Sequence, residues 1–460
     1  MGSAERGLAR REGRRIGTEG KGLGRRRLAH TPLAEPPGGS DFMMKSQPPG
    51  AKIFALNGEQ DPYVLFEIAR RDGPVQKIGG AWLILGHAEA TQLLRSPTTR
   101  SGFLADGYRA RLPPGAAREE MSHRVNFLDP PRHARVRGLI SKAFTPRRTS
   151  RLEPFIRERC RELIAPLSGE KPIDLLPAFA HEIPSLVISE LLGVPLEYRD
   201  RLTHLSTRVS KLLGTGNSSQ EMADAISGAE EMHATLRGII EARRQKPEDD
   251  LLSALLAVAE GDDRLSESEL LSLAATVYSA GHRTTRDLFA NGMTALLPNR
   301  ELMDAIRSGT PSSTAVVEEF LRFETPTHLV GRMLSEPMEL AGVTIPPGEG
   351  IFVGLAAANR DPAAYPDADR FDPARWIREP APPAPLSFVM GAHFCMGASL
   401  ARLEARVMLE VLLERLPELR LADEALHWHH TGVFRGVDAL WVIPGPARSV
   451  GARVTRTPAR

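Results

Sequence analysis

The stretch of sequence that decides the fold is Phe388-Val-Met-Gly-Ala-His-Phe-Cys395-Met-Gly397, near the end of the 460-residue chain. Its two glycines, Gly391 and Gly397, let the backbone turn and approach a flat cofactor closely. Apolar residues then repeat at helical spacing over residues 400–416, so Cys395 lies just ahead of an amphipathic helix. The N-terminus of that helix favours a thiolate. On these residues alone, Cys395 is a metal ligand, an inert core thiol, or a nucleophile with His and Asn partners elsewhere.

An acid and two arginines precede this loop. Glu319 and Arg322 are three residues apart, so they are neighbours on one helix face. Considered alone, such a pair is usually a surface ion pair of little energetic weight. Arg375 follows at the start of an irregular, proline-punctuated stretch, 375–385, which cannot be a continuous helix.

Basic residues form two further groups. His133 and Arg137 are four residues apart on one face of a helix that we expect near 134–144, and Arg332 follows the helix that carries Glu319. A basic helix face is in most proteins simply solvated, and these residues alone do not define a site.

The long helix expected over 265–297 contains Ala280-Gly-His-Arg-Thr-Thr285. Gly281 would permit a local opening of the helix, and Thr284 would offer a hydroxyl group inside it. Standing alone, the stretch would be an ordinary small-residue contact on a core helix.

Together these motifs resemble the cytochrome P-450 family of heme-thiolate proteins, because five of them occur in the family's order between about residues 61 and 444. Phe388-x-x-Gly391-x-His393-x-Cys395-x-Gly397 resembles the family's heme-binding loop. The resemblance implies heme b with Cys395 as the axial ligand of the iron, and Phe388, Gly391 and Gly397 around it. It also implies four groups that bind the heme carboxylates through charge-assisted hydrogen bonds: His133, Arg137, Arg332 and His393.

The resemblance gives the remaining motifs their roles. Glu319, Arg322 and Arg375 match a buried structural triad that braces the cysteine loop, with Arg370 a weaker candidate for the third place. The catalytic candidates match the family's oxygen-binding turn, and they are Ala280, Gly281, Arg283 and Thr284.

Arg283 is the departure from the family's pattern, since relatives usually have Asp or Glu there. An arginine stays protonated and cannot deliver protons. One interpretation is that Arg283 pairs with Asp287, four residues along the helix, and leaves proton delivery to Thr284 and ordered water. The other is that it binds a substrate carboxylate, as in the fatty-acid peroxygenase branch that the sequence resembles here. We favour the first because Thr284 is retained.

The fold class that we expect is mostly α with small β-sheets, in one large domain of the cytochrome P-450 type spanning residues 46–446. Helical spacing indicates helices near 134–144, 150–167, 179–193, 219–245, 265–297 and 313–323. A hairpin signal covers 74–85 around Gly79-Gly80, and short strands are expected at 338–345, 350–354 and 439–443.

The charge composition of the chain excludes one class of function. Lys+Arg 59 against Asp+Glu 57 is too balanced for a nucleic-acid binder. Residues 1–30 hold nine basic and three acidic residues without an apolar h-region, so we expect 1–45 to be a disordered basic extension, partly upstream of a start at Met43. Residues 447–460 are expected to be a flexible tail.

The only cysteines are Cys160 and Cys395, and so few suit a protein of the reducing cytoplasm. We expect Cys160 to be a packed thiol. No membrane segment is expected.

The expected activity is hydroxylation or epoxidation of a small apolar molecule with O₂ and two external electrons, in secondary metabolism. The resemblance implies a monomer served by ferredoxin and ferredoxin reductase, because two cysteines are too few for a cluster of its own. It also implies a pocket lined by residues 96–110, 275–285, 327–330 and 431–435.

Two alternative functions remain open. One is a peroxide-driven enzyme that acts on a carboxylate substrate, which Arg283 suggests. The other is a non-catalytic heme or ligand-binding protein.

Overall fold

The longest helix, α14 (Glu267–Leu296), begins where the sequence supplies a capping box. The Ser266 hydroxyl accepts the Glu269 N–H, and the Glu269 carboxylate accepts the Ser266 N–H. The same arrangement of Ser218 and Glu221 begins α12 (Ser219–Gln245). These caps fix the two long helices at the positions that helical spacing predicts.

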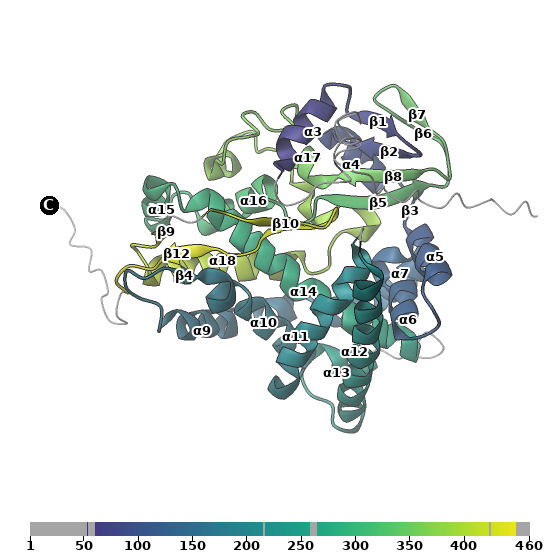
Figure 1. The fold of residues 1–460 in the computed structure, drawn as a ribbon, viewed down its shortest axis with the longest axis horizontal. Helices are drawn as coiled ribbons and strands as arrows, with labels where there is room; N and C mark the ends of the chain where they lie inside the picture. The colour runs from purple at the N-terminus through teal and green to yellow at the C-terminus, as the bar shows by residue number, and fades with distance from the viewer. Residues whose placement is uncertain (1–52, 54–59, 215–216, 258–264, 423–424, 448–460) are drawn as a thin grey trace, which may run out of the picture. The chain divides into compact units, whose positions relative to one another are not determined.

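This computed structural model describes residues 53, 60–214, 217–257, 265–422 and 425–447, all within the compact unit Leu33–Arg460. Most of the described residues are helical (Figure 1). The other α-helices are α3 (Pro62–Arg70), α4 (His87–Arg95), α5 (Gly102–Arg111), α6 (Ala116–His123), α7 (Arg132–Ala143), α8 (Pro146–Ser150), α9 (Glu153–Ile164), α10 (Glu182–Leu192), α11 (Leu196–Ser210), α13 (Leu251–Ala257), α15 (Arg300–Arg307), α16 (Ser313–Phe323), α17 (Leu355–Asn359) and α18 (Ala398–Arg415). Short 3₁₀ or π turns are η2 (Val125–Phe127), η3 (Leu176–Ala180), η4 (Lys211–Leu213), η5 (Pro373–Ile377), η6 (Leu386–Phe388) and η7 (Gly391–His393).

The strands form small sheets. They are β1 (Val75–Ile78), β2 (Ala81–Ile84), β3 (Thr99–Arg100), β4 (Ile173–Asp174), β5 (Leu329–Leu334), β6 (Met338–Leu340), β7 (Val343–Ile345), β8 (Gly350–Gly354), β9 (Arg420–Leu421), β10 (Trp428–His430), β11 (Arg435–Val437) and β12 (Trp441–Ile443). The largest sheet has the order β1-β2-β8-β5-β3, and its only parallel pair is β2 with β8. In Figure 1 this sheet lies at one end of the unit, with α3, α4 and α17 beside it. The helix-rich part therefore holds the main core, and the sheet is peripheral.

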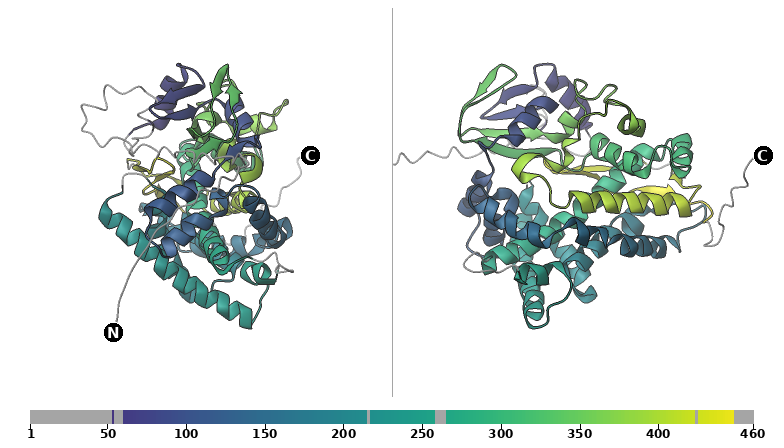
Figure 2. Two further views of the ribbon diagram at one scale, coloured as in Figure 1. Left: turned by 90° about the vertical axis from the view of Figure 1, so that its right-hand side faces the viewer. Right: turned by 180° about the vertical axis from the view of Figure 1, so that it is seen from behind.

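The main core gathers around α14, which packs against α6, α10 and α16. Helix α18 packs along α9, and its yellow-green ribbon crosses the unit in the rear view of Figure 2. Helices α14 and α16 approach so closely that a Cβ at Gly292 would overlap the ring of Phe320. Only glycine at position 292 allows this contact. It fixes the close packing of α14, which carries Thr284, against α16, which carries Glu319.

The expected mixture of many helices and small sheets is confirmed, and the hairpin forms around the expected Gly79-Gly80 turn, with Gly79 at φ +59°. Two details differ from the prediction. Residues 179–193 are not one helix, because the π turn η3 precedes α10. The strand expected at 338–345 is a hairpin, because Ala341 and Gly342 both take positive φ and reverse the chain.

Several predictions lie outside the described residues. These are the disordered extension 1–45, the boundary at residue 46, and nearly all of the tail 447–460. Among the described residues, no single helix is long and apolar enough to cross a membrane. One bent pair, Leu176–Leu192 with Leu196–Leu213, meets the length and composition requirement only across a bend of 116°.

Candidate active site

The cysteine loop is a tight, irregular turn between η6 and α18. The Cys395 N–H donates to the carbonyl of Phe388 at 3.0 Å, which closes the loop on itself. Val389 and Gly391 take positive φ, at 60° and 70°. A Cβ at Gly391 would collide with the carbonyl oxygen of Leu94 on α4. Glycine is therefore needed here for the close approach of α4 and for the positive φ of the turn. The loop thus presents Cys395 at the N-terminus of α18, as its sequence predicts.

The surroundings of the Cys395 sulfur contain opposing influences. Cys395 is exposed by surface area, but the protein atoms around its sulfur partly desolvate the thiol and raise its pKa, which is the largest effect. Hydrogen bonds from the backbone N–H groups of Gly397 and Ala398, together with the positive charges of Arg137 and Arg402, lower the same pKa. A loop that aims donors and cations at a sulfur is suited to hold it as an anion once a metal replaces the proton.

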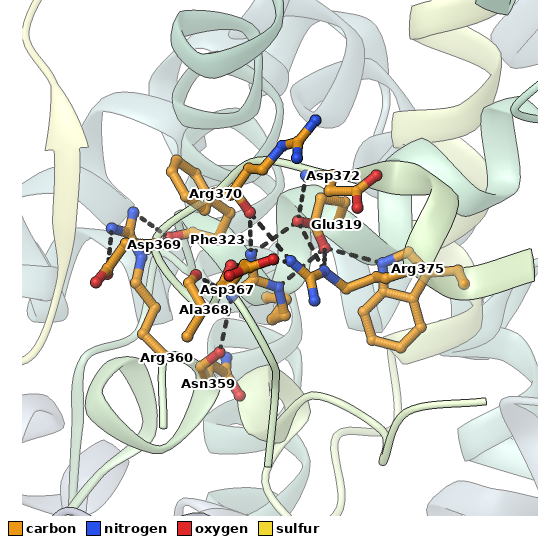
Figure 3. A network of polar contacts seen from close by, with 12 residues as sticks. Glu319, Phe323, Asn359, Arg360, Asp367, Ala368, Asp369, Arg370, Asp372 and Arg375 are labelled. Carbon is orange, nitrogen blue, oxygen red and sulfur yellow. Dashed lines mark hydrogen bonds and ion pairs between the residues drawn. The ribbon is translucent and has the colours of Figure 1, made fainter. Parts of the chain in front are cut away.

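Glu319, Arg322 and Arg375 form a buried cluster. Arg322 contacts Glu319 in a bidentate pair, with N···O distances of 2.9 and 2.7 Å, and both side chains are 0% exposed. The Nε of Arg375 donates to the same carboxylate at 3.2 Å, and Figure 3 shows this side chain directed toward Glu319. The indole N–H of Trp376 and the backbone N–H of Asp372 also donate to Glu319. Arg370 contributes only its carbonyl oxygen, so Arg375 is the third member.

Asn359 connects this cluster to the cysteine loop. Its carbonyl accepts from Arg322 at 3.2 Å, its side-chain oxygen accepts the N–H of Leu386 at 2.6 Å, and its amide donates to the Ser387 hydroxyl at 2.8 Å. Leu386 and Ser387 begin the turn that leads into the loop. Sequence reasoning missed Asn359 and Trp376, because no spacing rule relates them to Glu319.

The four basic residues expected to bind carboxylates come together from three parts of the chain. His133 and Arg137 lie on α7, Arg332 on β5 and His393 in η7, and the two imidazole rings are 4.2 Å apart. Burial lowers the pKa of Arg332 to about 10 and, with the neighbouring cations, that of His393 to about 3. Arg332 donates only to the carbonyl of Gly331, and the Nε2 of His133 has no hydrogen-bond partner among the described residues.

Helix α14 is continuous through Ala280 and Gly281, so the expected local opening is not seen. A Cβ at Gly281 would lie 2.6 Å from Cδ1 of Ile188, and glycine is therefore needed for the packing of α10. The hydroxyl of Thr284 donates to the carbonyl of Ala280 at 2.7 Å, and Thr285 repeats this bond to Gly281 at 3.1 Å. Such bonds to the preceding turn weaken and bend a helix locally without breaking it.

Arg283 is directed toward α11. Its guanidinium donates to the hydroxyl of Ser210 at 2.8 Å and lies 5.7 Å from the ring centre of Phe434. Its Nε is 3.9 Å from Asp287, which is ion-pair distance only, and Asp287 is held more closely by Arg286 at 2.6 Å. The pairing that we favour from the sequence is therefore present but loose.

Contacts join the four segments expected to line the pocket. A Cβ at Gly331 would lie 3.6 Å from Phe103, which places α5 beside β5. The His328 N–H donates to the carbonyl of Val433 at 2.8 Å, and Phe434 in turn contacts Arg283 on α14. These contacts connect α5, β5, the turn at Val433 and α14 in series, although the segments lie far apart in the sequence.

Known proteins match this chain along most of its length. A family model described as Cytochrome P-450 matches residues 310–417. The Vitamin D(3) 25-hydroxylase of Pseudonocardia autotrophica is 37% identical over 406 residues, covering 86% of this chain and 96% of that protein. This chain belongs to the cytochrome P-450 family.

Two further members illustrate the match. The cytochrome P-450 monooxygenase PikC of Streptomyces venezuelae is 35% identical, covering 89% of this chain and 97% of that protein. The crystal structure of the P-450 BioI in complex with an acyl carrier protein ligated to hexadec-9Z-enoic acid has a TM-score of 0.76 at 32% identity. It covers 83% of this chain and 98% of that one. The chain is therefore a heme-thiolate monooxygenase of the bacterial cytochrome P-450 type, with heme as its cofactor.

The residues present fit this cofactor. Arg332 is buried beside three other basic groups, and the carboxylate of Asp129 raises the pKa of both Arg332 and His133. One carboxylate among several buried basic groups leaves an excess of positive charge, which is unfavourable, so the cluster is suited to a ligand that brings negative charge of its own. The two carboxylates of heme would supply that charge.

Proposed function

We propose that this P-450 hydroxylates or epoxidises a small apolar molecule in secondary metabolism, using O₂ and two electrons from a ferredoxin and its reductase. The observation that carries the proposal is the cysteine loop, in which Cys395 meets converging N–H groups and cations at the N-terminus of α18. Cys395 would bind the heme iron, with His133, Arg137, Arg332 and His393 around the carboxylates. The heme supplies activation of O₂, and the protein supplies binding, orientation and protons.

An apolar substrate is supported by the apolar side chains of the segments that the resemblance assigns to the pocket. Phe103 and Leu104 of α5 lie against β5, and Val433 and Phe434 lie between β5 and α14. The external electron donor is supported by the cysteine content, since the chain has two cysteines and an iron–sulfur cluster is usually held by four. A monomer acting in the cytoplasm completes the proposal.

A second candidate function is peroxide-driven oxidation of a carboxylate substrate. The contacts of Arg283 favour it, because its one close hydrogen bond is to the neutral Ser210 while Asp287 is already paired with Arg286. A guanidinium with spare donors beside pocket residue Phe434 could bind a carboxylate.

One assay separates these functions. A panel of apolar and carboxylate compounds is first screened for displacement of the iron-bound water by its absorption spectrum. Compounds that bind are then incubated with ferredoxin, reductase and NAD(P)H, or with hydrogen peroxide alone. Product in the first reaction is expected, and product only in the second would favour the peroxide-driven enzyme. Binding without product in either would indicate a non-catalytic heme or ligand-binding protein.

A further inference from the structure

A buried carboxylate lies on α14 one turn beyond Arg283. The side chain of Asp287 is 1% exposed, and its Oδ1 is bound by Arg286 at 2.6 Å. Its Oδ2 is 3.9 Å from both Nε of Arg283 and Nε2 of His429. None of these three atoms has a hydrogen-bond partner among the described residues. Three unpartnered polar atoms therefore converge at one point, which is unusual in a protein interior.

His429 reaches this point from a distant part of the chain. It lies on β10, paired with Gly436 of β11, and the hairpin is held on α14 by a 3.1 Å hydrogen bond from Asn291 to the carbonyl of Arg435. A Cβ at Gly436 would lie 2.7 Å from the His429 ring and 2.8 Å from Cγ of Asp287. A side chain there would push the two groups apart, so this glycine keeps the imidazole beside the carboxylate.

A third group, the carboxylate of Asp438, lies beside His429 on the side that faces solvent. Nδ1 of His429 is 2.9 Å from the Asp438 carboxylate. The exposed fractions of the side chains fall from 57% for Asp438 to 22% for His429 and 1% for Asp287. The three groups therefore lead from the surface to the helix that carries Thr284, which is three positions before Asp287 and a neighbour on the helix surface.

The chemistry of the three groups suits proton transfer. Hydrogen bonding to Asp438 places the proton of a neutral imidazole on Nδ1, which leaves Nε2 as an acceptor facing a carboxylate that is also an acceptor. Two acceptors oppose each other until a proton, or one water, lies between them. Burial lowers the pKa of His429, as do Arg283 and Arg286, while Asp287 and Asp438 raise it.

We propose that Asp438, His429 and Asp287 form a proton-entry route that replaces the acid missing at position 283. The inference rests on the proposed function, whose balance is R–H + O₂ + 2 e⁻ + 2 H⁺ → R–OH + H₂O, with electrons from the ferredoxin. The resting imidazole carries its one proton on the nitrogen that faces Asp438. When Asp438 takes a proton from solvent, a flip of the ring turns the bare nitrogen toward Asp438 and the N–H toward Asp287. Asp438 then gives its proton to the bare nitrogen while the N–H proton passes to Oδ2 of Asp287, so one proton enters the ring, one leaves, and the ring is again neutral. Asp287 releases the proton toward the Thr284 hydroxyl, one turn earlier on the same helix.

The test uses the holoenzyme with His429→Gln and Asp287→Asn, and His427→Gln as the control, because His427 is exposed and two residues away. With ferredoxin and reductase, both variants are expected to lose product formation about tenfold or more, with electrons diverted to hydrogen peroxide. With added peroxide, turnover should change less than about twofold, because R–H + H₂O₂ → R–OH + H₂O requires no external proton. The control should match the parent in both reactions.

A second measurement does not depend on activity. Nuclear magnetic resonance titration of labelled histidines should show a lower pKa for His429 in Asp287→Asn than in the parent, because the carboxylate that raises it is removed. Equal losses in the two reactions would show a packing role and overturn the route. Unchanged reductase-driven coupling, or an unshifted titration, would do the same. A parent that produces nothing with ferredoxin would instead refute the proposed function.

Discussion

The two cysteines of this protein have opposite electrostatic surroundings. Cys160 is buried in α9, where burial and the nearby Glu404 both raise the pKa of its thiol, and Arg157 opposes them only weakly. Desolvation also raises the pKa of Cys395, but backbone donors and two arginines act against it. The expectation that Cys160 is a packed thiol is confirmed. Of the two, Cys395 is the one suited to bind a metal.

This difference predicts the outcome of two single substitutions. Cys395→Ala should abolish the red-shifted Soret band of the ferrous carbonyl complex, because that band requires a thiolate ligand. Cys160→Ala should retain the band and lose only stability, since a small buried side chain is truncated. A band that persists in Cys395→Ala, or a histidine-type spectrum in the parent, would contradict the ligand assignment.

Arg283→Glu tests the residue that departs from the family's pattern. An acid beside Thr284 should keep or raise reductase-driven turnover and leave substrate affinity nearly unchanged, measured by spectral titration. It should also make the loss caused by His429→Gln smaller, because a second source of protons is then present. Collapse of affinity for a carboxylate substrate, together with peroxide-driven activity, would show that Arg283 anchors the substrate.

At the scale of elements, the cysteine loop depends on a helix that it does not adjoin in sequence. Helix α16 supplies Glu319 and Arg322, η5 supplies Arg375, and Asn359 at the end of α17 joins them to Leu386. Most of the bonds in this cluster are made by charged groups in a buried place, where an unmatched partner is costly. Breaking the cluster should therefore both disorder the cysteine loop and lower the free energy of unfolding.

Removing one charge from the cluster should show this coupling. Glu319→Ala leaves two buried guanidinium groups without their carboxylate, which should cost about 3–5 kcal/mol, a large share of a typical domain stability of about 5–15 kcal/mol. We expect lost heme incorporation and a lower urea midpoint. Glu318→Ala is the matched control, because its ion pair with Arg402 is partly exposed and should contribute about 1 kcal/mol or less. Stable, active Glu319→Ala holoenzyme would refute the structural role.

The elements differ in how far the sequence predicts them. Capping boxes and long apolar periodicity make α12 and α14 predictable, and φ-demanding glycines reveal the β1–β2 turn. Several helices are not indicated by spacing, and α5 is an example, because it buries little apart from Ala105 and its sequence has no apolar face. Motifs with fixed spacing predicted the cysteine loop and the triad. Asn359 and His429 could not be found in this way, because their partners are set by tertiary packing alone.

At the scale of the whole molecule, the basic segment at the start of the chain is predicted to be dispensable. Residues 1–42 have no apolar periodicity that could join the core, so a chain beginning at Met43 should equal the full chain in heme content and melting temperature. Calorimetry and the pyridine hemochrome spectrum measure the two quantities. A drop of several degrees, or loss of heme, would show that this segment packs or binds something.

The close contact of Gly292 with Phe320 has a consequence for motion. Because the Phe320 ring fills the space that a side chain at position 292 would need, α14 is closely packed on α16 at this point and has little room to shift along it. Helix α11 is held to the same helix, because the hydroxyls of Thr203 and Ser206 on α11 contact Tyr278 and His282 on α14 at 2.9 and 3.2 Å. Residues 280–285, which lie between Tyr278 and Gly292, are therefore expected to keep their position when a substrate enters.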